Sequence, residues 1–153
     1  MSSPLGLANH SLYQARLLLA GWELARASER FPGPALDFAF APPVRDRLLA
    51  AYGCYLLAAC RVTQMPLSPP RSVSELPPLP TGLVRPQEVE HCVELERQGW
   101  LGDLLAPIAS LPGVSGSETL ASSRAAPSHE EMAAWAAALA DLAEQLTEAV
   151  DEF

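Results

Sequence analysis

The sequence contains no lysine, so all ten basic side chains are arginine, and isoleucine occurs once, at Ile108. β-branched apolar residues favour strands, whereas leucine and alanine favour helices. Leucine and alanine dominate the apolar residues, which make up 49% of the chain. The composition therefore predicts helices. A chain rich in alanine that uses only arginine as its base also suggests a bacterial protein from a GC-rich genome.

Positive charge is scarce as well. The chain carries 18 acidic and 10 basic side chains, and its formal net charge is −8. A surface that binds nucleic acid needs a basic footprint, and so does a surface that binds anionic lipid headgroups. We therefore expect this acidic protein to bind neither nucleic acid nor a membrane.

Cysteine and long apolar runs are also limited. None of Cys54, Cys60 and Cys92 belongs to a C-x-x-C pair, and each lies in an apolar stretch, so we expect free, buried thiols in a reducing cytoplasm. The first six residues lack the basic side chains of a signal peptide. The longest uncharged apolar run, residues 48–60, is shorter than the roughly 20 residues that span a bilayer. These features predict a cytoplasmic protein.

Several segments repeat apolar residues at alternating steps of four and three, which is the spacing of one helix face. The pattern predicts helices over residues 7–30, 43–64, 87–98, 100–111 and 128–153. In the first helix this seam consists of Ala8, Leu12, Ala15, Leu19 and Trp22. The second helix carries two apolar stripes, so we expect it at the centre of the bundle or in an oligomer interface. The last begins with a capping box, in which Ser128 and Glu131 satisfy each other's backbone donors.

Proline and glycine mark the connections between these helices. Residues 31–43 hold four prolines together with Phe31, Phe38 and Phe40. We expect an ordered loop there, whose phenyl rings either pack on the bundle or form a docking patch.

Two further connections are predicted from composition. Residues 66–86 hold seven prolines, which excludes a helix or a central strand and predicts a stiff connector. Residues 112–127, rich in Gly, Ser and Ala, are expected to form a flexible loop. The chain is thus predicted to be all-α: one domain over residues 1–153, a helical bundle of about four helices with Pro-rich connectors.

No recognised catalytic, nucleotide or metal motif is present. G-x-S-x-G, the Walker loop and G-x-G-x-x-G are all missing. Glu88-x-x-His91 matches half of a di-iron pattern, but that chemistry needs a second such motif. His10 and His129 lie near the starts of helices expected at opposite ends of the bundle, so the three histidines should not converge. We therefore predict no catalytic residue, metal or cofactor; whether the chain is an enzyme stays open, with the negative answer favoured.

Two functions remain. The first is a non-enzymatic protein-interaction or regulatory module, with a protein partner or a homo-oligomer. A homodimer of this kind would bury one of the first two helices. Its candidate interaction surface comprises Phe31, Phe38 and Phe40. The alternative is a small-molecule-binding bundle, or an enzyme, with an unrecognised pocket between the first two helices. Its candidate ligand-binding residues are Glu23, Tyr52, Tyr55, Arg61 and His91.

Several short motifs follow one another along the chain in a recognisable order. They are Asn9-x-x-Leu12-Tyr13, Trp22-Glu23, Leu48-Leu49 with Cys60-Arg61, Gly99-Trp100-Leu101 with Leu104-Leu105, and Glu130-Glu131-Met132-x-x-Trp135. This order resembles a family of small gammaproteobacterial proteins catalogued only as a domain of unknown function. The resemblance implies a helical cytoplasmic protein and supplies no activity or catalytic residue. Residues 66–86 depart from the resemblance, because they are richer in proline than that family leads one to expect.

Overall fold

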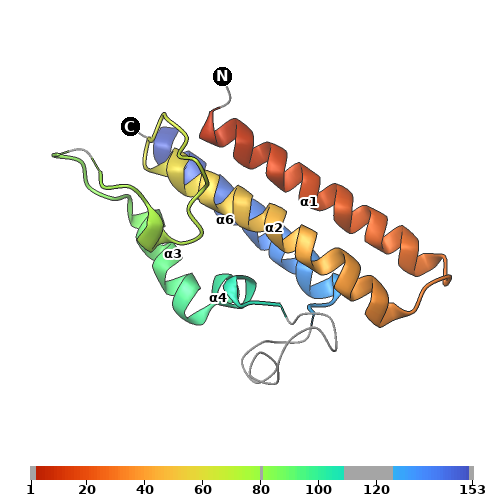
Figure 1. Ribbon diagram of the computed structural model, residues 1–153. Helices are drawn as coiled ribbons and strands as arrows, with labels where there is room; N and C mark the ends of the chain where they lie inside the picture. The colour runs from red at the N-terminus through yellow and green to blue at the C-terminus, as the bar shows by residue number, and fades with distance from the viewer. Residues whose placement is uncertain (1–2, 80, 109–125, 152–153) are drawn as a thin grey trace.

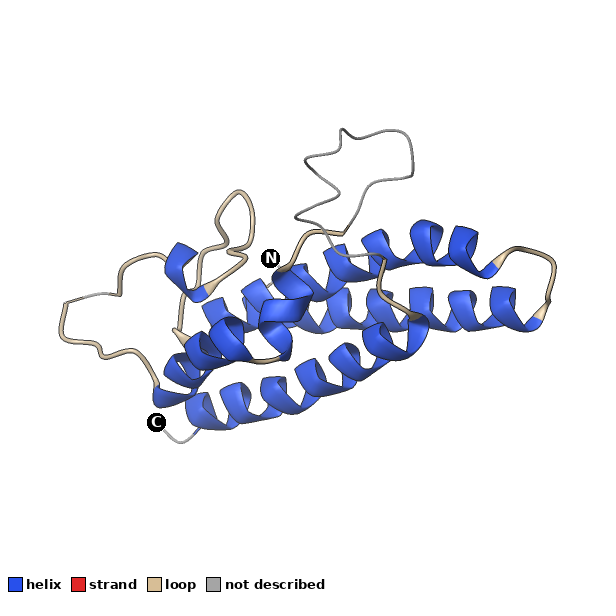
Figure 2. Cartoon of the chain, turned by 90° about the horizontal axis from the view of Figure 1, so that it is seen from below, coloured by secondary structure: helices blue, strands red, loops and turns tan. Residues whose placement is uncertain are grey.

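The computed structural model describes residues 3–79, 81–108 and 126–151. Within these ranges three long helices lie side by side (Figure 1): α1 (Pro4–Ala27), α2 (Gly33–Ala59) and α6 (His129–Asp151). Two shorter helices, α3 (Gln87–Gln98) and α4 (Trp100–Leu105), pack beside them. The described residues form helices and loops and no strand (Figure 2), so the predicted all-α bundle is confirmed.

Helix α1 runs antiparallel to α2 and α6. At one end of the bundle, the Arg26 guanidinium near the end of α1 lies 2.9 Å from the Glu130 carboxylate at the start of α6. At the other end, the Tyr55 hydroxyl of α2 donates a hydrogen bond to the Asn9 side-chain oxygen of α1 (2.6 Å). Helices α1 and α6 therefore begin at opposite ends, as expected, and His10 lies far along the bundle from His129.

The predicted seams form the core. In α1 every residue of the seam is buried, and Trp22 and Ala15 are fully so. Helix α2 is buried on most sides between Leu48 and Ala59, which confirms its central position. In α6 the buried apolar residues are Met132, Trp135, Ala136, Leu139, Leu142, Ala143 and Leu146. Over the described residues, none of the helices combines the length and the apolar character of a membrane-spanning segment.

Helix α1 begins and ends earlier than the spacing of its apolar residues predicts. The Gly6 amide donates to the Ser3 hydroxyl (3.0 Å), and Pro4 occupies the first helical turn. Serine at the N-cap and proline directly after it are a strong helix start. At the other end, the Ser28 hydroxyl donates to the Ala25 carbonyl (2.7 Å) and closes the helix.

The predicted loop over residues 31–43 is wrong, because α2 already begins at Gly33 and continues through Pro42 and Pro43. Both prolines are exposed, so water can hydrate the carbonyls that lose their backbone donors. Phe40 continues the packed face of α2, and its ring stacks on Trp22 with 5.8 Å between centroids. A proline inside a helix costs about 3 kcal/mol, and burial of apolar side chains on the same turns offsets that cost.

The described part of residues 66–86 contains one short 3-10 turn, η1 (Val73–Glu75), and is otherwise extended or looped, as the proline content predicts. This connector lies directly on α2. A methyl group added at Gly53 would meet the Pro70 carbonyl oxygen at 2.0 Å. Glycine at position 53 therefore allows the connector backbone to touch the helix.

Helices α3 and α4 meet at Gly99, where the predicted break is confirmed. Helix α4 ends at Leu105 rather than near residue 111, and Arg45 of α2 binds its end. The Arg45 guanidinium donates to the carbonyls of Leu104 (2.9 Å) and Leu105 (2.8 Å). The predicted flexible loop over residues 112–127 lies outside the described residues except for its last two positions.

The start of α6 matches its predicted capping box. The Glu131 amide donates to the Ser128 hydroxyl (3.1 Å), and the Ser128 amide donates in return to the Glu131 carboxylate (3.5 Å). This reciprocal pair satisfies two backbone donors at the first turn.

Candidate functional site

The five residues predicted to line a ligand pocket do not meet in one place. Tyr55 and Arg61 border the same pocket at one end of the bundle, whereas Glu23 lies near the opposite end. Tyr52 is buried against α3, and His91 is exposed on that helix.

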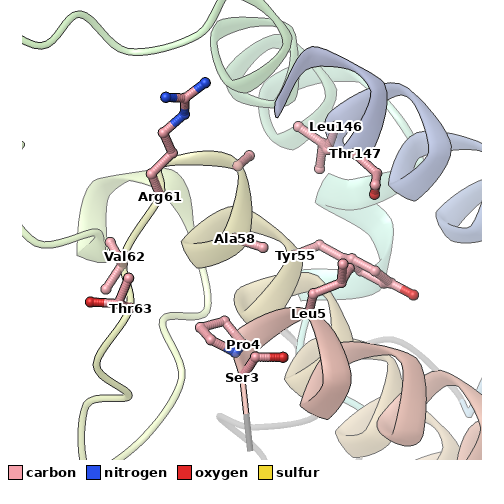
Figure 3. Close-up of a pocket in the computed structure, with 11 residues that line it drawn as sticks. Ser3, Pro4, Leu5, Tyr55, Ala58, Arg61, Val62, Thr63, Leu146 and Thr147 are labelled. Atoms are coloured by element: carbon pink, nitrogen blue, oxygen red, sulfur yellow. The ribbon is translucent and has the colours of Figure 1, made fainter. Parts of the chain in front are cut away.

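The pocket at the bundle end lies where the start of α1 meets the ends of α2 and α6 (Figure 3). Its volume is about 370 Å³, within the range of small-molecule sites. Its walls are mostly apolar and include Pro4, Leu5, Ala58, Val62 and Leu146. The arrangement suits a small apolar molecule better than a charged one.

Tyr55 is one of the polar residues that line this pocket, together with Ser3, Arg61, Thr63 and Thr147. Its hydroxyl is already bonded to Asn9. Burial raises the pKa of the Tyr55 phenol, and the nearby Arg16 lowers it by a smaller amount. The phenol is therefore neutral at physiological pH and acts as a hydrogen-bond donor rather than as a base.

Arg61 closes α2 instead of facing the pocket interior, and its guanidinium extends away from Leu5 and Leu146 in Figure 3. Its backbone has φ 59°, the left-handed conformation. The Arg61 amide donates to the Ala58 carbonyl (3.0 Å), and the next amide, of Val62, donates to the Leu57 carbonyl (3.0 Å). These two bonds form a Schellman motif, in which glycine is the usual residue at this position.

Tyr52 belongs to a polar cluster that holds the Pro-rich connector in place. The Tyr52 hydroxyl donates to one Glu96 carboxylate oxygen (2.5 Å), and the Val73 amide donates to the same oxygen (3.0 Å). Glu96 of α3 thereby joins α2 and the connector through one atom. The sequence does not single out Glu96, because its spacing along α3 resembles that of the exposed acids around it.

Burial keeps the Tyr52 phenol and the neighbouring Cys92 thiol neutral. It is the largest cause that raises the pKa of the Tyr52 phenol far above its usual range. It also raises the pKa of the Cys92 thiol to about 12. A reactive cysteine needs the thiolate form near neutral pH, so we expect the Cys92 thiol to be unreactive.

Glu23 takes part in a network that joins α1 to α6. Its carboxylate lies 3.4 Å from the Arg26 guanidinium and 3.6 Å from the His129 ring. The second ring nitrogen of His129 lies 3.0 Å from the Leu19 carbonyl, and the ring packs edge-on against Trp22 at 5.2 Å. These contacts join α1 to α6, so packing of the two helices explains the position of Glu23 without a ligand pocket.

Three phenylalanines were candidates for an interaction surface, and the structure separates them. Phe31 is 57% exposed just beyond the end of α1. Phe38 and Phe40 are half-buried within α2, and Phe40 packs on Trp22. Any docking patch that includes Phe31 must therefore draw its other residues from elsewhere.

Those other residues lie on the outer face of α1. Tyr13 is 58% exposed, Leu17 54% and Leu24 74%, and the exposed Ala20 and Ala27 continue the same row. The steps between them are four, three, four and three, so they share one stripe of the helix. We call these five residues the outer stripe of α1.

The outer stripe lies on the side of α1 opposite its buried seam. One residue in an α-helix turns by about 100°, which places Leu17 and Leu24 roughly opposite Leu12 and Leu19. Helix α1 therefore carries apolar residues on two faces, of which α2 and α6 cover one. Figure 1 shows α1 along the outside of the bundle.

A family model described as "Family of unknown function (DUF6586)" matches residues 1–153. The chain belongs to this family. No curated protein and no solved structure matches it. Membership of DUF6586 confirms the resemblance to a family whose function is unknown, and its description names no activity, ligand or partner.

For this DUF6586 member, the shape and chemistry of the exposed surfaces and pockets are the available guide to function. Among the residues that the structure describes, no group of three or more His, Cys, Asp or Glu side chains is placed to hold a metal ion. Among the described residues, the outer stripe of α1 and the bundle-end pocket both present apolar side chains that are not covered by the bundle.

Proposed function

We propose that this chain is a non-enzymatic protein-interaction module, which docks another polypeptide on the outer stripe of α1. The observation that carries the proposal is the exposure of Tyr13, Leu17 and Leu24 in one helical row. Single exposed apolar residues are ordinary, but a continuous row of them on a helix marks an interaction site.

Energetics favour a covered stripe. Burial of one leucine side chain contributes about 1.5–3 kcal/mol, and Leu17 and Leu24 are each more than half exposed. An amphipathic or doubly apolar helix that packs alongside α1 would recover this free energy. Helix-to-helix packing of this kind recognises its partner by residues spaced three and four apart, which is the spacing of the outer stripe.

The working location that we propose is a reducing cytoplasm. Cys54, Cys60 and Cys92 are all free and buried, and burial raises the pKa of each thiol. Free thiols of this kind are typical of proteins that are never exposed to an oxidising compartment.

Photo-crosslinking tests the docking surface directly. A benzoyl-phenylalanine replaces Leu17 in the chain expressed in its own host, and a control chain carries the same probe in place of the exposed Arg97 on α3. We expect the probe at position 17 to form a covalent adduct of defined mass with one polypeptide, and Leu24→Glu to abolish it. Equal adduct yields from positions 17 and 97, or none from position 17, would contradict the proposal.

The second candidate function is binding of a small apolar molecule in the bundle-end pocket, and its volume and apolar walls favour it. The probe is N-phenyl-1-naphthylamine, an uncharged dye whose fluorescence rises in apolar sites. We expect saturable fluorescence that Ala58→Phe removes, because the larger side chain fills the pocket. Replacement of Ala20, on the outer stripe, by phenylalanine is the matched control. Unchanged fluorescence in Ala58→Phe would remove the pocket from consideration.

A further inference from the structure

We propose that the polypeptide docked on the outer stripe is a second copy of this chain, with the two α1 helices antiparallel. This inference rests on the proposed function and adds the partner, the orientation and the register. Two facts on the outer face of α1 carry it: the spacing of the outer stripe and the charges along one edge of it.

The outer stripe has the repeat of a two-helix seam. When two helices pair, two positions in each seven-residue repeat face the partner, and they are spaced alternately three and four residues apart. The outer stripe has this spacing. A two-fold axis makes the same surface serve both copies, so a stripe on a single helix can form both sides of the interface.

The residues that fill the seam complement one another in size. In the proposed register, Leu17 faces Ala20 of the second copy, and Tyr13 faces Leu24 of the second copy. Each contact occurs twice about an axis near Leu18 and Leu19. Each leucine thus meets either the small Ala20 side chain or the flat ring of Tyr13, which allows the two helices to approach closely.

Charge selects this register. Arg16 and Glu23 are exposed, seven residues apart, and each directly precedes one of the two leucines of the stripe. In antiparallel paired helices, residues at this flanking position face each other across the seam. Arg16 of each copy therefore meets Glu23 of the other, which gives two ion pairs related by symmetry. Such flanking pairs set the orientation and register of paired helices more than their affinity.

The alternatives lack this complementarity. An antiparallel register in which Leu24 faces Ala20 would bring Glu23 against Glu23 of the second copy, and Arg16 would face a position beyond the end of α1 at Ala27. A parallel pair would place Arg16 opposite Gly21 and Glu23 opposite Ser28, and neither is charged. Like charges across an interface oppose association, so the first antiparallel register is the one that the outer face of α1 supports.

The contacts of α1 inside its own bundle leave this face accessible. Glu23 is 58% exposed although it also lies near Arg26 and His129, so its carboxylate can accept a further donor. On the other edge, Gly21 packs near Phe40 and Gln14 accepts from Arg47. The outer stripe therefore remains outside the contacts with α2, and its charged edge lies on the side of α1 that borders α6.

Exchanging the two charges tests the proposed pairing in the purified chain of 153 residues, with the dissociation constant measured by sedimentation equilibrium. We expect a dimer with a dissociation constant on the order of micromolar, because the paired stripes form a small interface. Arg16→Glu and Glu23→Arg should each raise that constant about tenfold. The double exchange, Arg16→Glu with Glu23→Arg, should restore it to within about threefold of the natural chain.

The matched control is Arg97→Glu, which reverses an exposed charge that pairs with Glu94 on α3. We expect it to leave the dissociation constant unchanged. Circular dichroism establishes that every variant is folded before its association is interpreted. A monomer at about 100 μM, or a double exchange that does not recover association, would overturn the proposal.

Disulfide trapping gives an independent test of orientation. In the antiparallel pair, Tyr13→Cys in one copy lies beside Leu24→Cys in the other. A mixture of the two variants should therefore cross-link under oxidised glutathione, and neither should cross-link alone. Like positions would be separated along the axis by about 16 Å, too far for a disulfide. Cross-linking of either variant alone would show a parallel pair and overturn the proposed arrangement.

The photo-adduct at position 17 separates failure of this inference from failure of the proposed function. An adduct with a different protein would overturn the second-copy proposal and leave the interaction module standing. Absence of any adduct would overturn both.

Discussion

At the scale of single residues, two positions near the end of α2 affect stability through steric fit and backbone conformation. Gly53 allows the Pro70 carbonyl to touch α2, and Arg61 holds a left-handed conformation that glycine adopts more readily. We expect a substitution at Gly53 to lower stability and a glycine at position 61 to raise it. The two changes together test the fold around the bundle end.

We expect Gly53→Ala to destabilise the protein by about 1–3 kcal/mol, because the new methyl group overlaps the Pro70 carbonyl and forces the connector away. Urea unfolding followed by circular dichroism measures the free energy change. Gly33→Ala is the control, since nothing lies within 4 Å of a methyl group there. Equal stabilities of the two variants would show that the connector does not rest on α2.

Arg61→Gly should stabilise the protein by about 1 kcal/mol, since it relieves the left-handed strain and keeps both Schellman hydrogen bonds. The same urea titration detects the gain. Arg61→Ala keeps the strain and removes the side chain, so it reports the contribution of the side chain alone. A loss of stability in Arg61→Gly that matches the loss in Arg61→Ala would show that side-chain contacts outweigh the strain.

The thiol of Cys92 predicts how stability responds to alkaline pH. Burial raises its pKa in the folded state to about 12, above the unfolded value near 9. The folded state therefore holds the proton more tightly, and its advantage is complete below pH 9 and is lost as pH rises from 9 to 12. We expect the free energy of unfolding to fall across this window, and to fall less steeply in Cys92→Ala. Identical slopes would contradict the burial of the thiol.

At the scale of elements, local signals predicted some helices and tertiary packing decided others. The bounds of α3 and the cap of α6 followed from proline, glycine and a serine–glutamate pair, all of which act within one turn. The start of α2 did not follow from local signals. The stacking of Phe40 on Trp22 joins residues of two helices, and it outweighs the preference of Pro42 and Pro43 to end a helix.

The connector is an element that one carboxylate oxygen holds in place. Glu96→Gln should lower stability by about 1–2 kcal/mol, because the neutral amide accepts more weakly from the Tyr52 hydroxyl and the Val73 amide. Hydrogen exchange at the Val73 amide should speed up more than the loss of global stability explains. Glu94→Gln, on the exposed side of α3, is the control. Unchanged exchange at Val73 would remove Glu96 from this role.

At the scale of the whole molecule, α1 is covered by its own bundle on one face and open on the other. The repeat of Tyr13, Leu17 and Leu24 is visible in the sequence, but so is the repeat of Leu12, Leu19 and Trp22. Spacing alone cannot say which of two apolar faces of a helix is turned inward. The candidate interaction surface could be found only once α2 and α6 were in place, whereas the all-α class followed from composition and spacing.

Tyr13 offers a direct measure of whether the outer stripe is covered when the protein works. Of the three tyrosines, Tyr13 is exposed, while Tyr52 and Tyr55 are buried, so nitration by tetranitromethane at pH 8 reports on position 13. We predict slow nitration of Tyr13 in extracts of the native host and rapid nitration in Leu17→Glu/Leu24→Glu under the same conditions. Equal, rapid nitration of both chains would show that the stripe stays bare and would contradict its role as a docking surface.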